Sequence, residues 1–401
     1  MVEGKCVEVD NEQTTLTAAG GVSKLQWQAL ITLHHTLLHE YHNFFLASQH
    51  PSASPALPRL ASKYAMPARM WRHGIHSFLE LMRHHLPECL DHMIAPTYIA
   101  YAILELLYET VPAFEDTWIE CLGSLARYRM AIEDDDTRDR EVWRGVARYW
   151  YSKGSDRAPT TGRLYHHLAI LARPNALRQL FYYTKSLCVV SPCTPARESI
   201  LTLFHPIRER NYNLPPFHAV YIKAQEVLFK NQETVIFEPF LQQFLTSLDA
   251  YIHTEVECFK PEGYHIALAN TFAMLGFGSK NNIIMKVIDS SSPESVDSLK
   301  AENISLDESF KNAQRLNNAA LEIVLQRTRD SNVLPFVHCS LAFMYCMSRF
   351  PAAISHIQVG FPWERLAAFL NELLDSHGDP FPSIESDKFP ATGCIWWLSG
   401  Q

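Results

Sequence analysis

Long stretches of this chain contain neither glycine nor proline and repeat their apolar residues every three or four positions. That interval matches the α-helical turn of about 3.6 residues, so each stretch can bury one face. Glycine supplies only 15 of the 401 residues, well below an average share of about 7%. We therefore expect an all-α protein with almost no β-structure, large enough for two domains or one long superhelix.

The predicted helices follow one another along the chain and are separated by turn-rich segments. They cover 25–49, 70–85, 96–110, 118–131, 142–153, 163–171, 176–190, 311–327, 334–348 and 363–377, and a further set of helices covers 220–275. Helix 96–110 is almost entirely apolar, so we expect it to be central. The polar, Ser-rich segment 289–309 is predicted to be a mobile loop. The tail after 377 carries Trp396 and Trp397, and we expect it to pack back onto the protein.

The predicted helix that begins at Trp118 places two arginines in very different surroundings. Arg129 falls in the middle of the apolar face that contains Trp118, whereas Arg127 falls almost opposite. A buried unpaired charge costs several kcal/mol, so Arg129 needs an internal partner. We expect that partner to be a carboxylate on the preceding helix, Glu105 or Glu109.

A weak internal repeat links two of the predicted helices. The pattern of apolar and small residues at 119–126 recurs at 165–172, with Gly123 and Ala169 at equivalent positions. Small residues there would let two helices approach closely. The spacing resembles a tetratricopeptide repeat whose usual period of about 34 residues is lengthened by the acidic loop EDDDTRD. Such helical solenoids offer a concave face for binding.

Six segments, in this order, resemble the Est/SMG family of telomerase-associated proteins and nonsense-mediated mRNA decay adaptors. They are RMWRHGIHSFLELMR (69–83), LGSLARYR (122–129), TTGRLYHHLAILA (160–172), LFYYTKSL (180–187), PFVHCSLAFMYCMSRFPAAISHI (335–357) and FPWERLAAFLNELL (361–374). The resemblance implies a 14-3-3-like, tetratricopeptide-type superhelix followed by a helical-hairpin domain. We expect a flexible N-terminus at 1–24, the first domain at 25–210 and the second at 211–401. The chain most resembles short fungal members without a PIN nuclease domain.

The resemblance also implies a phosphoserine-binding groove and names its residues. Carried over to this sequence, the phosphate grip is formed by Arg72 and Arg127, with Tyr128 at the groove edge and Arg69 as a third donor. Two guanidiniums can bind the three phosphate oxygens bidentately. Ser124 stands where the family usually has Asp. The expected protein is a non-catalytic adaptor for a phosphorylated segment of a partner protein, acting in the nucleus, the cytoplasm or both.

Two other readings stay open. The first is direct binding of RNA or single-stranded DNA, at a local basic patch because the net charge is −8. Its candidate residues are Arg138, Arg140, Arg144, Arg148, Arg163 and Lys185, of which Arg140, Arg144 and Arg148 recur every four residues as one stripe. The second is a scaffold whose phosphate site has decayed. Loss of the stripe would leave an adaptor intact but weaken RNA binding.

Other classes of protein are not favoured. His35, His39 and His42 lie on one helix face, but the HExxH pattern of zinc proteases is absent, so we expect no metal. The phosphate-loop, dinucleotide-binding and GxSxG patterns are also absent, so we expect neither an enzyme nor a cofactor. Nine cysteines without a CxxC pair indicate free thiols in a reducing compartment. The sequence contains no signal-peptide pattern and no apolar run of about 20 residues for a membrane span.

Overall fold

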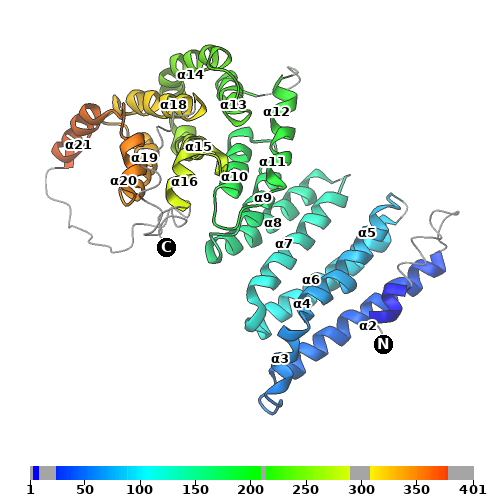
Figure 1. Cartoon of the computed structure of the whole chain (residues 1–401). Helices are drawn as coiled ribbons and strands as arrows, with labels where there is room; N and C mark the ends of the chain where they lie inside the picture. The colour runs from blue at the N-terminus through cyan, green and yellow to red at the C-terminus, as the bar shows by residue number, and fades with distance from the viewer. Residues whose placement is uncertain are drawn as a thin grey trace. The chain divides into compact units, whose positions relative to one another are not determined.

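The computed structural model of the chain describes residues 3–8, 24–87, 89–134, 136–208, 214–289 and 308–377. Helices joined by short turns make up these residues (Figure 1). Within the described ranges, β-structure is confined to an isolated bridge between Thr161 and Ser191. The all-α prediction is therefore confirmed. The segment 290–307 and the tail after 377, which hold the predicted loop and the two tail tryptophans, lie outside the described residues.

The chain divides into two compact units, Met1–Arg157 and Ala158–Gln401, which we call unit 1 and unit 2. The sequence-based division at 210 falls well inside unit 2. Each unit has its own hydrophobic core. A division of this kind depends on which amphipathic faces pack against one another, and the periodicity of each helix does not specify that choice.

Unit 1 begins with a short helix at 3–8 and continues through eight further helical elements. They are α2 (Lys24–Gln49), α3 (Ala56–Lys63), α4 (Met66–Arg69), the π-helix η1 (Met70–His76), α5 (Ser77–Arg83), α6 (Leu90–Thr110), α7 (Glu115–Ile132) and α8 (Thr137–Arg157), with the 3₁₀ turn η2 (Pro112–Phe114) between α6 and α7. Trp118 of α7 is fully buried and its ring contacts Phe45 of α2 edge-on. Helix α7 thus supplies much of the core of unit 1.

Helices α7 and α8 lie in close contact at a glycine. A Cβ atom built on Gly123 would lie 3.0 Å from the ring of Tyr151, which is itself fully buried. Only glycine lets the Tyr151 ring pack this closely against the α7 backbone. The prediction that a small residue at 123 permits close helix approach is confirmed.

The short helix at 3–8 packs onto unit 1 instead of remaining free, although the sequence alone suggested a flexible N-terminus at 1–24. Cys6 is fully buried, and the Tyr41 hydroxyl of α2 donates a hydrogen bond of 2.6 Å to Glu3. Arg69 donates two hydrogen bonds to the same carboxylate. Glu3 therefore links the N-terminal helix to α2 and α4.

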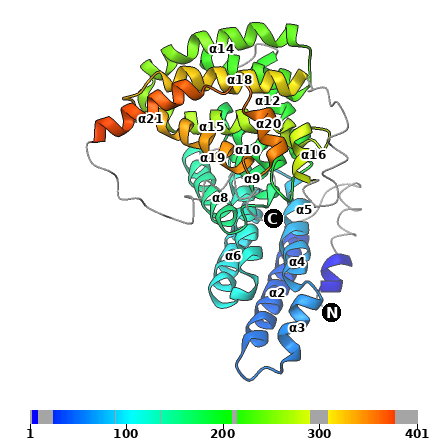
Figure 2. The ribbon, with the colours of Figure 1, turned by 60° about the vertical axis from the view of Figure 1, so that its left-hand side comes forward.

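Unit 2 is a larger helical assembly built around α15. Its elements are α9 (Gly162–Leu171), α10 (Ala176–Leu187), α11 (Ala196–Ser199), α12 (Leu201–Arg208), α13 (Pro216–Phe229), α14 (Thr234–Thr254), α15 (Val256–Met274), η3 (Gly276–Gly278), α16 (Ile283–Asp289), α18 (Glu308–Leu325), η4 (Ser331–Val333), α19 (Leu334–Met347), α20 (Pro351–Ile357) and α21 (Trp363–His377). Helices α14 and α18 lie side by side, and α15 contacts α10, α18 and α19 (Figure 2). Every residue of α15 from Ile266 to Met274 is buried.

One prediction about an individual helix was wrong. Helix 96–110 is not central, because Tyr98 and Leu106 of α6 are 46% and 49% exposed. The apolar composition of α6 instead gives unit 1 an exposed hydrophobic surface. The helical set predicted over 220–275 consists of three helices, since the chain turns at Asn231, where φ is +51°, and again at Glu255. None of the helices in the described residues is both long and apolar enough to cross a bilayer.

Candidate functional site

Arg129 is buried, as predicted, but its partners are not those expected. Its guanidinium pairs with Glu133 at 2.6 Å, one turn further along, and with Asp139 of α8 at 2.5 Å. The expected partners, Glu105 and Glu109, do not form this ion pair. Burial opposes a rise in the pKa of Arg129, but its hydrogen bond to Glu133 and the negative charges of Asp139 and Glu133 raise that pKa. Arg129 therefore joins α7 to the start of α8 and does not face a ligand.

Tyr128, the next residue towards the N-terminus, points to a different neighbour. Its hydroxyl donates a hydrogen bond to the Glu80 carboxylate of α5, and its ring contacts His76 edge-on at 6.0 Å between centroids. Burial pushes the pKa of Glu80 upward, but the bond from Tyr128 and the nearby charges of Arg83 and His76 hold it below its usual value. The contact thus places the Glu80 carboxylate next to Tyr128, a predicted phosphate ligand. The sequence did not indicate this carboxylate.

Arg72 lies on the π-helix η1, four residues before His76. The turn of this helix is wider than that of an α-helix, and the Ser77 hydroxyl donates a hydrogen bond of 2.7 Å to the backbone carbonyl of Arg72. Such π-helical turns are rare and occur frequently at functional sites. The side chain of Arg72 is exposed, and no ion pair holds it within the described residues. Its charge is therefore available to an anion from solution.

Arg127 of α7 is half-buried and lies between two aromatic residues. Its guanidinium is 5.8 Å from the centroid of the Tyr128 ring, and its positive charge acts on the Tyr151 hydroxyl, whose pKa burial raises. The Tyr151 hydroxyl and the Ser124 hydroxyl are hydrogen-bonded at 2.9 Å. Ser124 is neutral, so it does not form an ion pair with Arg127. The buried Nε of Arg127 has no hydrogen-bond partner within the described residues.

Arg69 differs from these two arginines because it is already paired. It lies at the end of α4 and binds Glu3 with Nη2 at 2.7 Å from the carboxylate oxygen. Arg83 is likewise paired with Glu80 at 2.7 Å. Of the predicted phosphate ligands, Arg72 lies on η1 with His76, and Arg127 lies on α7 next to Tyr128. Neither has an ion pair in the described part of the chain, whereas Arg69 is neutralised by Glu3.

The predicted nucleic-acid residues do not form one free basic surface. Arg140 lies 3.9 Å from Asp134, and Arg144 pairs with Glu141 at 2.5 Å. Arg148 and Arg163 are exposed, as is Arg138. Lys185 departs from the prediction: it is buried, and its ammonium lies 4.1 Å from the centroid of the Tyr165 ring. Amphipathic α10 turns Lys185 inward, so it does not present its charge to solvent.

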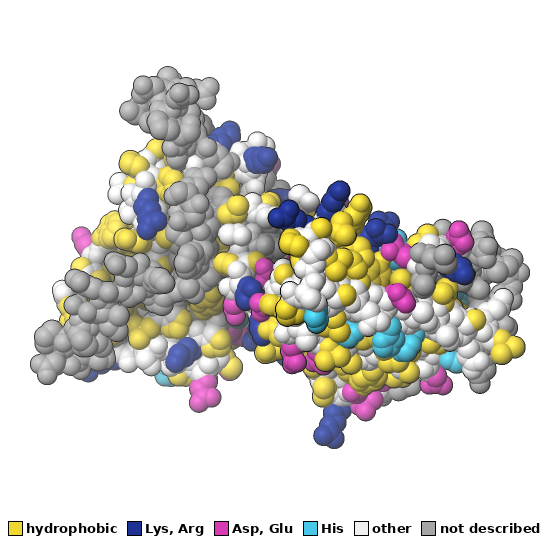
Figure 3. Space-filling view, turned by 90° about the horizontal axis from the view of Figure 1, so that it is seen from below, with side chains coloured by type: hydrophobic (Ala, Val, Ile, Leu, Met, Phe, Trp, Pro, Cys, Tyr) yellow, Lys and Arg dark blue, Asp and Glu magenta, His cyan; other side chains and the backbone are white. Residues whose placement is uncertain are grey.

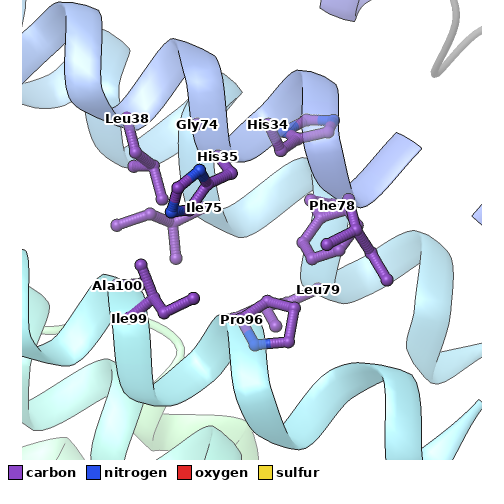
Figure 4. A pocket seen from close by; sticks show the side chains of 11 residues that line it. His34, His35, Leu38, Gly74, Ile75, Phe78, Leu79, Pro96, Ile99 and Ala100 are labelled. Atoms are coloured by element: carbon purple, nitrogen blue, oxygen red, sulfur yellow. The ribbon is translucent and has the colours of Figure 1, made fainter. Parts of the chain in front are cut away.

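Histidines gather among apolar side chains on one face of unit 1 (Figure 3). The Nε2 atoms of His35 and His39 are 3.1 Å apart, whereas His34 is buried and stacks on Phe78 at 4.7 Å. His34 and His35 line a small apolar pocket with Gly74, Phe78 and Pro96, between α2, η1 and α6 (Figure 4). No group of three residues that could hold a metal ion occurs in the described residues.

Comparison with known proteins shows the family to which this chain belongs. A family model described as "Est1 DNA/RNA binding domain" matches residues 147–390. This chain belongs to the Est1 family. Among curated proteins, the telomerase-binding protein EST1A of Danio rerio is 35% identical over 92 residues. That alignment covers 22% of this chain and 6% of the relative, so the chain spans only a small part of that protein. The predicted relation to Est/SMG proteins is confirmed.

The Est1 match and the candidate phosphate grip lie in different parts of the chain. The matched region begins at 147, in the middle of α8, and extends through the helices of unit 2. Arg72 and Arg127 precede it and belong to unit 1. The family description therefore applies to the part of the chain that contains Arg148 and Arg163, and it does not test the grip in unit 1.

Proposed function

We propose that this Est1-family chain is a non-catalytic adaptor, and that unit 1 binds a phosphoserine segment of a partner protein through Arg72 and Arg127. The observation that carries the proposal is that η1 and α7, which bear these two arginines, meet at the His76–Tyr128 contact, and that Arg69, Arg83 and Arg129 are already paired while these two have no ion pair in the described residues. A phosphoserine has nearly two negative charges and three acceptor oxygens, which match two guanidiniums that have no carboxylate partner. Arg69 would contribute only after it releases Glu3.

The test is calorimetric titration of the full chain with phosphoserine peptides and with the same peptides unphosphorylated. We expect binding only with phosphate, and a weakening of about tenfold or more for Arg72→Glu or Arg127→Gln, because each removes charge-assisted hydrogen bonds of about 1.5–3 kcal/mol. Arg59→Glu is the matched control, since Arg59 is exposed on α3. Equal binding by both peptides, or by the Arg72→Glu variant and the wild type, would refute the phosphoserine site.

Inorganic phosphate offers an independent measurement on the same protein. Phosphate that binds the folded state should raise the melting temperature above that in sodium chloride of equal ionic strength. The rise should disappear in Arg72→Glu and persist in Arg59→Glu. A rise of the same size in all three proteins would reflect general exclusion of phosphate from the surface.

A second function, direct binding of RNA or single-stranded DNA, is favoured by the family description of residues 147–390 and by the telomerase-binding relative. Arg148 and Arg163 are the exposed candidates within that range. Replacing both with Glu should weaken oligonucleotide binding and lower its salt dependence by about 0.7 per lost phosphate contact. Arg59→Glu again controls for net charge. These relations support a role at telomeres or in mRNA decay, in the nucleus or the cytoplasm.

A further inference from the structure

An open groove of about 460 Å³ runs between α6 and α8 in unit 1. Both helices pack against α7 (Figure 1). Aromatic side chains of α6 and α8 contact one another across the space between them. Tyr101 and Glu105 of α6 form one wall, and Val142, Val146, Tyr149 and Trp150 of α8 form the other. A Cβ on Gly145, which also lines the groove, would meet nothing within 4 Å, so this part of the groove is open.

A carboxylate on the α6 wall lies one turn after a tyrosine that is held in place. The Trp150 ring N–H donates to the Tyr101 hydroxyl at 2.7 Å, and Glu105 follows Tyr101 by four residues on α6. Glu105 has no ion pair within the described residues, in contrast to Glu80, Glu133 and Glu141. Burial, and the negative charge of Glu109, raise the pKa of Glu105. A cation in the groove would relieve this repulsion.

The same aromatic cluster already holds one lysine. The ammonium of Lys153 lies 4.7 Å from the Tyr108 ring centroid, 5.6 Å from that of Trp150 and 5.8 Å from that of Tyr149. These distances are within the range of cation–π attraction, for which Trp and Tyr are the most effective rings. Lys153 is not paired with Glu105, so it does not neutralise the carboxylate of the groove.

We propose that the groove between α6 and α8 binds a lysine side chain from a partner protein segment whose neighbouring residues are apolar. The ammonium pairs with Glu105, and the methylene stem of the lysine packs against Tyr149 and Tyr101. Val142 and Tyr149, each 56% exposed, meet the apolar neighbours of that lysine. Phosphate groups of a nucleic acid do not suit this groove, because Glu105 and Glu109 repel them.

The test uses a dye-labelled, end-capped peptide, Ala-Leu-Lys-Leu-Ala, and the full chain in fluorescence anisotropy. In the matched peptides, norleucine or glutamate replaces the lysine, so that the stem is kept without charge or the charge is reversed. We expect the lysine peptide to bind at least tenfold more tightly than the norleucine peptide, and the glutamate peptide not to bind.

Protein variants separate charge from shape. Glu105→Gln should remove the preference for lysine over norleucine, and Tyr149→Ala should weaken both peptides. Glu40→Gln, on the exposed surface of α2, is the control and should bind as wild type does. Equal binding of the lysine and norleucine peptides, or no binding of the lysine peptide, overturns the proposal. Binding of an oligouridine that is lost in Tyr149→Ala, without lysine binding, would assign the groove to base stacking instead.

Discussion

The Tyr128 hydroxyl of α7 donates its hydrogen bond to the Glu80 carboxylate of α5, and this bond links the helix that carries Arg127 to the helix that directly follows the π-helix of Arg72. Because the acceptor is charged, Tyr128→Phe should lower the free energy of unfolding by about 1–2 kcal/mol at pH 7. Urea denaturation measures the loss. Tyr64→Phe, an exposed tyrosine on the turn before α4, should change stability by less than about 0.5 kcal/mol. A loss no larger than this control would mean that the bond does not contribute to stability.

The same bond predicts a pH dependence. The pKa of Glu80 is lowered in the folded state because the bond from Tyr128 and the charges of Arg83 and His76 outweigh the effect of burial. A carboxyl with a lowered pKa takes up protons more readily in the unfolded chain, so it stabilises the fold at pH values above about 4.5 and ceases to do so at lower pH. The stability difference between wild type and Tyr128→Phe should therefore shrink between pH 5 and pH 3. A difference that stays constant over this range would exclude Glu80 as the charged acceptor.

Arg129 provides a prediction about a buried ion pair. Its side chain is 6% exposed and binds both Glu133 and Asp139. Arg129→Gln leaves two carboxylates without their cation, and we expect a loss of about 3 kcal/mol in the free energy of unfolding. The control is Arg83→Gln, because Arg83 forms an exposed pair with Glu80 of the kind that contributes about 0–1 kcal/mol. Comparable losses in the two variants would contradict the buried role of Arg129.

Two glycines inside helices form a matched pair. Gly123→Ala places a Cβ 3.0 Å from the Tyr151 ring, so we expect a destabilisation of about 1–2 kcal/mol by overpacking. Gly145→Ala meets open space and should stabilise α8 by up to about 1 kcal/mol through helix propensity. Thermal or urea unfolding of both variants checks the opposite signs. Stabilisation by Gly123→Ala would mean that α7 and α8 can separate at no cost.

Much of the candidate site was predictable from the sequence. Helical periodicity places Arg129 on the apolar face of α7 and Arg127 away from it, and the structure buries the first and leaves the second half-exposed. The partner of Arg129 was predicted wrongly, because a carboxylate one turn later, Glu133, and one across the following loop, Asp139, reach it first. The local sequence EDDD was the signal for this partner. Glu3, by contrast, is paired with a residue remote in sequence, Arg69, which no local pattern indicated.

The sequence by itself determined the all-α class, the Est1 relationship, the burial of Arg129 and the small residue at 123, because helical faces and side-chain volume are local properties. The tertiary structure decided which helices share a core and turned Lys185 inward. It buries α15 within unit 2 and leaves one side of α6 exposed in unit 1. It also decided that Tyr128 meets Glu80 and that Trp150 bonds to Tyr101 across the groove. These contacts depend on which of several similar amphipathic faces pack together, and that choice is made by the fit of whole helices.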